Sequence, residues 1–208
     1  AVAKLGGNAS FVGQVGRDLF GDFLKTTLQH YGVDTSALAQ HATAKTALAF
    51  VAHDDKGERS FSFYRDASAD LLFSKSQITP QLFDDGKVLH FCSNTLVEPA
   101  IAEVTAELIQ QASSHGLWLS FDVNLRHNLW FEGQANTGLV RRFVAQADIL
   151  KFSMDEMLYL LNDTSMDIQT YVQQLLGQKA QLVVITHDDK PLQYFSRYGS
   201  GVLPVPQV

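Results

Sequence analysis

The sequence has 208 residues, and its 22 acidic side chains outnumber its 16 Lys and Arg side chains, which gives a formal net charge of −6. This charge argues against nucleic acid and anionic membrane surfaces as partners, because both attract a basic protein face. The hydrophobic fraction of 46% is typical of a globular protein with a sizeable core, and no apolar run is long enough to cross a membrane. Cys92 is the single cysteine, so no internal disulfide can form, and we expect a reducing compartment, the cytoplasm.

The two ends of the sequence resemble the interior of a longer protein. The chain begins AVAKLGG, without Met, and finishes VLPVPQV, without a polar tail. Gly6 and Gly7 suit the end of a helix that starts earlier. We therefore expect the chain to be a piece of a longer protein.

The N-terminal part predicts a strand over residues 8–15 and an amphipathic helix over residues 20–33. The helix has apolar side chains at the helical period, namely Phe20, Phe23, Leu24, Leu28 and Tyr31. The glycine-rich stretch GQVGRDLFGD lies between them and lacks both the dinucleotide fingerprint and the Lys-Ser/Thr pair of a P-loop. We interpret it as a structural turn in which Asp18 caps the helix.

A hairpin is predicted over residues 46–65. Two alternating runs flank the turn residues Asp54-Asp55-Lys56-Gly57. The first run is apolar on both faces, with Ala47, Ala49 and Val51 opposite Leu48, Phe50 and Ala52. Because apolar faces are normally covered, this strand favours pairing with a second copy in a homodimer.

The remainder alternates strands and helices. Strands are predicted at 88–92, 117–123, 149–152 and 182–186, and a final hairpin at 192–196 and 201–205. Helices are predicted at 99–112, 137–147, 154–161 and 168–176. This rhythm is typical of an α/β fold, a parallel sheet with helices on both faces. The hairpin at 46–65 does not fit the rhythm, so we place it outside the main sheet.

Polar side chains follow several of the predicted strands. They are Ser93, Asn94, Asp122, Asn124, Arg126, Ser153, Glu156 and Thr186. Because the carboxyl ends of parallel strands meet at one edge, where ligands bind, these groups are expected to share a cleft.

Each of these side chains has a functional and a structural interpretation. Arg126 can hold a phosphate with two hydrogen bonds, or it can pair with Asp122. Glu156 can orient a hydrated Mg²⁺, or it can complement the helix dipole in a first turn. Lys151 can face a phosphate, or it can be a solvated rim residue.

Five stretches resemble the ribokinase-like (PfkB-type) carbohydrate kinases, in the order of that family. LGGNASFVGQVGRDLFGDFL resembles the N-terminal signature, and GERSFSFYRDASADLLF resembles the lid strand and Ser-Ala-Asp segment of bacterial fructokinases. SFDVNLR is similar to the Asp-Pro-Asn-x-Arg motif, and ADILKFSMDEMLYL is similar to the Lys-x-Ser/Asn-x-x-Glu segment. LVVITHDDK resembles the strand that leads into the nucleotide site.

The resemblance implies a ribokinase-like three-layer sandwich and an activity. The core would comprise residues 1–45 and 66–208, and residues 46–65 would form a small β lid. The reaction implied is transfer of the γ-phosphoryl group of ATP to a sugar hydroxyl, closest to that of fructose. Mg²⁺ is the implied metal ion, with K⁺ as a further candidate, and the implied partners are the sugar and ATP.

The resemblance also implies roles for individual residues. Arg126 would be catalytic, lying between the sugar and the γ-phosphate, and Glu156 would bind Mg²⁺ through water. The sugar contacts would come from Tyr64, Arg65, Asn94 and Arg126. The nucleotide contacts would come from Asn124, Lys151, Ser153, Thr186 and Asp188.

Some family features are absent from this sequence. The Gly-Ala-Gly-Asp segment that supplies the catalytic base would follow Val208, so residues 1–208 alone are expected to be inactive. Asp188 and Pro191 replace glycines, which puts a carboxylate near the phosphates and removes a backbone donor. Two alternatives therefore stay open: a non-catalytic binding or dimerisation relative, and a kinase for a riboside or a keto-deoxy sugar acid.

Overall fold

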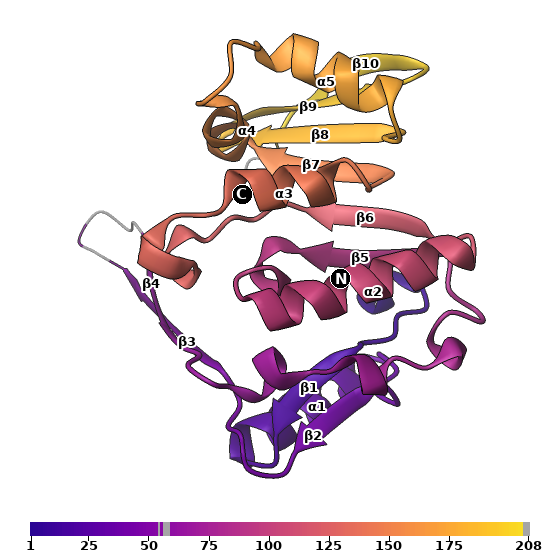
Figure 1. Ribbon diagram of the computed structural model, residues 1–208, viewed down its shortest axis with the longest axis vertical. Helices are drawn as coiled ribbons and strands as arrows, with labels where there is room; N and C mark the ends of the chain where they lie inside the picture. The colour runs from indigo at the N-terminus through magenta and orange to yellow at the C-terminus, as the bar shows by residue number, and fades with distance from the viewer. Residues whose placement is uncertain (54, 56–58, 206–208) are drawn as a thin grey trace. The chain divides into compact units, whose positions relative to one another are not determined.

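The computed structural model describes residues 1–53, 55 and 59–205 and divides into two compact units, Ala1–Thr79 and Pro80–Val208 (Figure 1). The hairpin over residues 46–65 belongs to the first unit. The family resemblance implied different domains, a core of residues 1–45 and 66–208 and a lid of residues 46–65. That domain assignment stays a prediction. The two units are described separately below.

The first unit is built on a short parallel strand pair. Strand β1 (Gly13–Gly16) pairs with β2 (Leu38–His41), and helix α1 (Leu19–His30) lies between them in the chain. The observed strand is shorter than the one predicted over residues 8–15 and begins at Gly13. Before it, Ser10 forms an isolated β-bridge with Asp34. β2 was not predicted. Three short 3-10 turns complete the unit, η1 (Ala3–Leu5), η2 (Ala69–Leu72) and η3 (Lys75–Gln77).

The glycine-rich turn before α1 is structural, as predicted. The Asp18 carboxylate accepts a hydrogen bond from the backbone N–H of Gly21 at 2.9 Å and so caps α1. A side-chain carbon at Gly21 would lie 2.0 Å from the carbonyl oxygen of Gly16, so only glycine fits there. Asp18 also accepts hydrogen bonds from the Thr46 N–H at 2.9 Å and from its hydroxyl at 2.8 Å. The helix start is therefore tied to the first residue of the hairpin.

Helix α1 has the predicted period, but most of its apolar side chains are exposed, with Leu28 half-buried. Phe23 is 65% exposed, and Phe20, Leu24 and Tyr31 are between 41% and 50% exposed. Gly21 is the one buried residue of the helix. The helical period is therefore confirmed, and most of the apolar stripe lies at the surface of the described residues.

The predicted hairpin is present as a separate two-stranded sheet. β3 (Leu48–His53) and β4 (Arg59–Tyr64) pair in antiparallel register from Leu48 opposite Tyr64 to His53 opposite Arg59. Turn residues 54, 56 and 57 lie outside the described residues. From Ala49 onward every residue of β3 is exposed, on both faces of the strand.

The second unit contains a six-stranded sheet in the order β10-β9-β8-β7-β6-β5. Its strands are β5 (Val88–Cys92), β6 (Trp118–Asp122), β7 (Ile149–Ser153), β8 (Leu182–His187), β9 (Lys190–Ser196) and β10 (Gly199–Leu203). β5 to β8 are parallel, and β9 and β10 add an antiparallel edge. The predicted mainly parallel sheet and the terminal hairpin are therefore confirmed.

The helices of the second unit follow the predicted positions. They are α2 (Pro99–Ser114), α3 (Thr137–Val144), α4 (Met154–Leu161) and α5 (Ile168–Gly177). Short 3-10 turns lie at η4 (Pro80–Leu82), η5 (Ser93–Thr95), η6 (His127–Leu129) and η7 (Phe131–Gly133). Among the described residues, no helix combines the length and the apolarity that crossing a bilayer requires.

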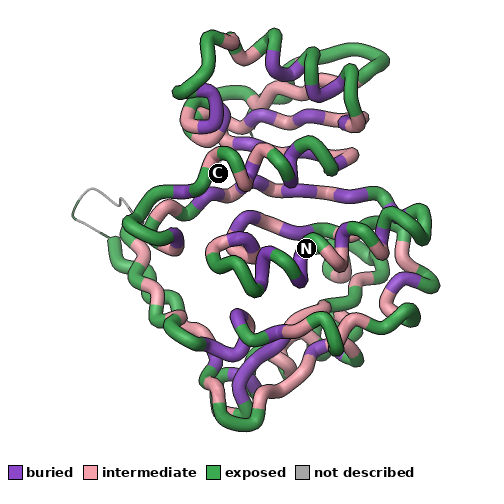
Figure 2. The backbone as a smooth tube through the Cα atoms, in the orientation of Figure 1, coloured by how far each residue is buried: buried purple, intermediate pink, exposed green. Residues whose placement is uncertain are grey.

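The core of the second unit covers one face of the sheet. Buried and half-buried residues alternate along β6, β7 and β8, which Figure 2 shows as purple and pink stretches. The buried positions are Leu119, Phe121, Leu150, Phe152, Val183 and Ile185. On the other face, Val88 and Trp118 are about half exposed.

Candidate functional site

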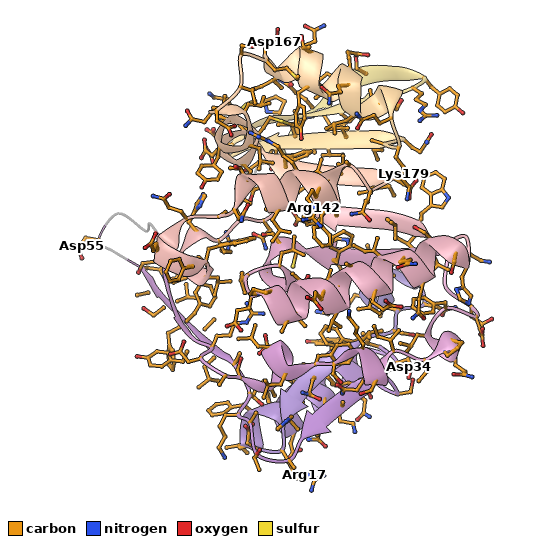
Figure 3. All side chains as sticks on the ribbon, in the orientation of Figure 1. Arg17, Asp34, Asp55, Arg142, Asp167 and Lys179 are labelled. Atoms are coloured by element: carbon orange, nitrogen blue, oxygen red, sulfur yellow. The ribbon has the colours of Figure 1, made fainter. Side chains whose placement is uncertain are left out.

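The candidate site lies at the carboxyl ends of the parallel strands of the second unit. The register places Cys92 beside Asp122, Asp122 beside Lys151, and Ser153 beside Thr186. The predicted polar groups of this unit therefore share one edge of the sheet. The edge is distinct from the one where the strands start, where Lys179 (labelled in Figure 3) pairs with Asp148 at 3.5 Å.

Glu156 links the ends of two neighbouring strands. One carboxylate oxygen accepts a hydrogen bond from the Leu125 N–H at 2.9 Å, and the other accepts from the Ser153 N–H at 2.8 Å. Ser153 in turn accepts from the Glu156 N–H at 3.2 Å, which completes a capping box on α4. Glu156 therefore lies in the first turn of α4, as its structural interpretation required. The N–H that its carboxylate contacts belongs to Leu125, the residue before Arg126.

The segment from Asn124 to Arg126 has an unusual backbone. Both of these residues have φ of +39°, a left-handed conformation that is uncommon for residues other than glycine. Leu125 between them is 2% exposed, and its carbonyl accepts a hydrogen bond from the Trp130 indole N–H at 2.8 Å. The Ser93 hydroxyl donates to the Asn124 carbonyl at 3.1 Å. The loop thus presents an exposed Arg126 from a fixed backbone.

The sequence did not indicate that Trp130 and Ser93 hold the backbone of this loop by hydrogen bonds. Trp130 follows Arg126 by four positions, and its only signal was an aromatic residue beside a motif. Ser93 was identified as a strand-end polar group, but its contact with Asn124 depends on the fold.

Lys151 pairs with Asp122 instead of standing alone at the rim. The ammonium and carboxylate lie 3.1 Å apart, with side chains that are 38% and 32% exposed. Within the described part of the chain, the contacted oxygen of Asp122 is buried without a hydrogen bond of good geometry, so the Lys151 charge compensates it. Asp122, which the structural interpretation paired with Arg126, thus has Lys151 as a partner.

The loop after β8 contains the residues that replace the family glycines. Asp188 has φ of +43° in the tight turn between β8 and β9, a conformation that Asp tolerates better than most residues. The Thr186 hydroxyl donates to the Phe152 carbonyl at 3.3 Å. A cavity of about 250 Å³ lies next to this turn, lined by Met154, Ile185, His187, Lys190, Pro191, Gln193 and Val202.

The sugar-site candidates Tyr64 and Arg65 lie in the first unit. Tyr64 is 67% exposed. The Arg65 side chain is 12% exposed, and its Nε donates to Asp70 at 2.7 Å. Ser68 donates both to Asp70 and to the Arg65 carbonyl, so the Ser-Ala-Asp segment holds Arg65 in place. Among the residues that the structure describes, Nη1 of Arg65 is a buried donor without a hydrogen-bond partner.

Asn94, the remaining sugar-site candidate, belongs to the second unit. It is half-buried after β5, and its side-chain oxygen accepts from the Cys92 thiol at 2.7 Å. The contact with Cys92 uses only the oxygen of the Asn94 side chain, and the two N–H donors of that side chain take no part in it.

The residues fit a hydrated metal ion better than a protein-enclosed one. Within the described residues, no three His, Cys, Asp or Glu side chains gather closely enough to hold a metal directly. Glu156 presents a single carboxylate whose oxygens each keep a lone pair beyond the backbone contacts. That donor set suits an ion such as Mg²⁺, which keeps most of its waters.

The chain matches one protein family along its whole length. The profile described as pfkB family carbohydrate kinase matches residues 1–208. The chain belongs to the pfkB family of carbohydrate kinases. Among curated relatives of this pfkB chain, the fructokinase of Vibrio alginolyticus is 37% identical over 190 residues, which are 91% of the chain and 61% of that protein. Probable fructokinase-5 of Arabidopsis thaliana is 33% identical over 204 residues, 98% of the chain and 63% of that protein.

Solved structures show the fold of the pfkB chain. The crystal structure of fructokinase from Xylella fastidiosa is 42% identical with a TM-score of 0.93, covering 100% of the chain and 64% of that protein. A Vibrio cholerae O395 fructokinase, crystallised with fructose, ADP and a calcium ion, is 32% identical with a TM-score of 0.88 over 100% of the chain and 66% of that protein. The ribokinase-like α/β fold is therefore confirmed. The chain spans roughly three fifths of the length of the curated relatives above, which cover 61% and 63%.

Proposed function

We propose that the protein containing this chain is an ATP-dependent sugar kinase that phosphorylates fructose. The observation that carries the proposal is the contact between Glu156 and the Leu125 N–H, because it joins the two strand ends that bear Arg126 and Ser153. The relatives named above as fructokinases support fructose as the acceptor.

The proposed roles suit phosphoryl transfer, in which a protein mainly positions the reactants and stabilises charge. Arg126 contacts the sugar and the transferred phosphoryl group. The N-terminus of α4 adds the positive end of a helix dipole beside it. The nucleotide side of the site comprises Asn124, Lys151, Ser153, Thr186 and Asp188.

Metal ions belong to the same proposal. Vibrio cholerae O395 fructokinase has been crystallised with fructose, ADP and calcium, and a double mutant of it with fructose, ADP and potassium. We assign Mg²⁺ to this chain, with Glu156 accepting hydrogen bonds from its water shell, and we keep K⁺ as a second cation. When bound, Mg²⁺ supplies charge neutralisation at the phosphates.

The hairpin is proposed as a lid that also dimerises. The unpartnered Nη1 of Arg65 is a donor that a sugar hydroxyl could satisfy, and the exposed Tyr64 ring lies next to it in sequence. Both faces of β3 are exposed, with Phe50 at 58% and Val51 at 50%, which supports coverage by a second lid. The single cysteine of residues 1–208 supports a cytoplasmic location, which belongs to the same proposal.

Asp188 and Pro191 favour a second candidate, a binding or dimerisation protein without catalysis. The turn that contains Asp188 puts a carboxylate where the family has glycine, although Lys190 is only two residues away. Calorimetry with ATP and Mg²⁺ bears on this candidate, because heat of ATP binding would count against a loss of the nucleotide site at Asp188 and Pro191.

The experiment for the main proposal uses the complete protein that contains this chain. Purified protein is assayed with ATP and Mg²⁺ against fructose, ribose, a riboside and a keto-deoxy sugar acid. We expect the largest kcat/KM with fructose. A higher kcat/KM with one of the other acceptors would show that fructose is not the preferred substrate. If none of the acceptors is phosphorylated, the proposal of a sugar kinase is refuted.

A further inference from the structure

The peptide between Leu125 and Arg126 is held at its carbonyl. This carbonyl and the Arg126 N–H belong to one rigid plane, so fixing the carbonyl fixes one side of the Arg126 φ rotation. Arg126 has φ of +39°, and Asn124 has the same value. A non-glycine residue persists in this region only when its surroundings enforce it.

Two side chains enforce the conformation from opposite sides of Leu125. Glu156 accepts from the Leu125 N–H at 2.9 Å, and the Trp130 indole N–H donates to the Leu125 carbonyl at 2.8 Å. The second bond is buried, and Trp130 is 7% exposed. Water therefore has little access to replace the bond if the indole N–H is removed.

Trp130 is itself fixed by the following turns. Its backbone N–H donates to the His127 carbonyl at 3.0 Å, and its carbonyl accepts from the Gly133 N–H at 2.9 Å. The Tyr159 hydroxyl, one turn beyond Glu156 on α4, donates to the Ala135 carbonyl at 2.9 Å. The loop is thus anchored to α4 at two places, and the indole stands between them in sequence.

We infer that Trp130 is a positioning residue for Arg126. Its indole N–H holds the Leu125 carbonyl, which keeps the Arg126 backbone left-handed and its guanidinium directed at the reacting groups. The inference rests on the proposed function, since it assumes that Arg126 contacts the transferred phosphoryl group. In this account Trp130 contacts neither the sugar nor ATP, but it sets the geometry of Arg126, which does contact substrate.

The test replaces Trp130 with Phe in the complete protein, which keeps an aromatic ring and removes the N–H. Trp118→Phe is the matched control, because Trp118 is the other tryptophan of residues 1–208 and lies half-exposed at the start of β6, the far end of the strand. We expect Trp130→Phe to lower kcat by at least tenfold, with KM for ATP and fructose changed less than threefold, because geometry is lost mainly in the transition state. Wild-type kcat in Trp130→Phe would overturn the inference.

A double-mutant cycle shows whether the effect runs through Arg126. If it does, Trp130→Phe should cost little further activity in an Arg126→Ala background, because the group it positions is already gone. A full tenfold loss in that background would mean that Trp130 acts independently of Arg126, which contradicts the inference.

A crystal structure of Trp130→Phe separates this inference from the proposed function. We expect Arg126 to leave the left-handed region or the Leu125 carbonyl to turn. An unmoved loop would overturn the inference even if the wild-type protein proves inactive on every sugar. Inactive wild-type protein together with a displaced loop would refute the kinase proposal while the positioning of Arg126 stands.

Discussion

The carboxylate of Glu156 accepts a hydrogen bond from the backbone N–H of Leu125 at 2.9 Å, so the first turn of α4 is tied to the loop that presents Arg126. The other carboxylate oxygen is bound by the Ser153 N–H at 2.8 Å. Two strand ends that are 31 residues apart in the chain therefore behave as one rigid group. This coupling makes the stability of the fold and the geometry of the candidate site depend on the same side chain.

Replacing Glu156 with Gln should affect both properties. The amide has one oxygen acceptor, so one of the two backbone N–H groups loses its partner and faces an NH₂ group instead. We expect a loss of about 1–3 kcal/mol in the free energy of unfolding, measured by urea titration, together with lower kcat. Asp155→Asn, an exposed residue in the same turn, is the control. Equal stability of the two variants would contradict the bridging role.

Asp70 should control sugar binding through Arg65. Asp70→Asn removes the charge opposite the largely buried guanidinium, whose Nε lies 2.7 Å from the carboxylate. We expect KM for the sugar to rise several-fold with a smaller change in kcat, and stability to fall by about 2 kcal/mol because a mostly buried charge loses its partner. The exposed neighbour Asp66, changed to Asn, should leave both unaltered. An unchanged KM in Asp70→Asn would remove Arg65 from the sugar site.

Lys151 allows its two interpretations to be separated. Lys151→Met should weaken ATP binding if the ammonium faces a phosphate, and it should destabilise the fold because Asp122 loses its counter-charge at 3.1 Å. Adding Asp122→Asn should restore stability but leave the KM for ATP high. If the double variant recovers both properties, Lys151 is only the partner of Asp122.

The stability of the first unit should depend on pH through Asp18. The Thr46 backbone N–H, with further bonds from Gly21 and the Thr46 hydroxyl, lowers the pKa of Asp18 below its ordinary 3.8. A lowered folded-state pKa contributes stability that is present above the unfolded pKa and is lost as the pH falls through the folded pKa. Asp18→Asn should therefore cost stability at pH 7 and progressively less below about pH 3.8. Denaturant titrations at pH 7 and pH 3 measure this, with Asp66→Asn as an exposed control in the same unit. A difference that stays constant with pH would contradict the assignment.

The regular parts of the fold could be predicted because the sequence marks their boundaries. Pro99 and Gly116 bracket the predicted and observed helix α2, and the strand at 88–92 and the helix at 154–161 have the predicted bounds. β2 was missed because LAQH is short and half polar. The period of α1 was visible, but a period does not say which surface covers it, and its stripe is exposed.

The candidate site was predictable in its residue types but not in its contacts. Strand order placed Arg126 and Glu156 at one edge, since parallel strands end together. The partners of Asp122 and Leu125 depend on cross-strand register and on a left-handed backbone at Asn124, which no spacing rule encodes. Trp130 acts through a hydrogen bond to a backbone carbonyl, so its role leaves no pattern in the sequence.

The most direct test of the central claim is the kcat for fructose phosphorylation by the complete protein carrying Arg126→Ala. The matched control is Arg142→Ala, an exposed arginine on α3 (labelled in Figure 3). A site built on the carboxyl ends of β6 and β7 predicts that Arg126→Ala loses about a hundredfold or more in kcat, while Arg142→Ala keeps the wild-type rate. If Arg126→Ala retains wild-type kcat with a folded protein, phosphoryl transfer does not take place at this edge of the sheet.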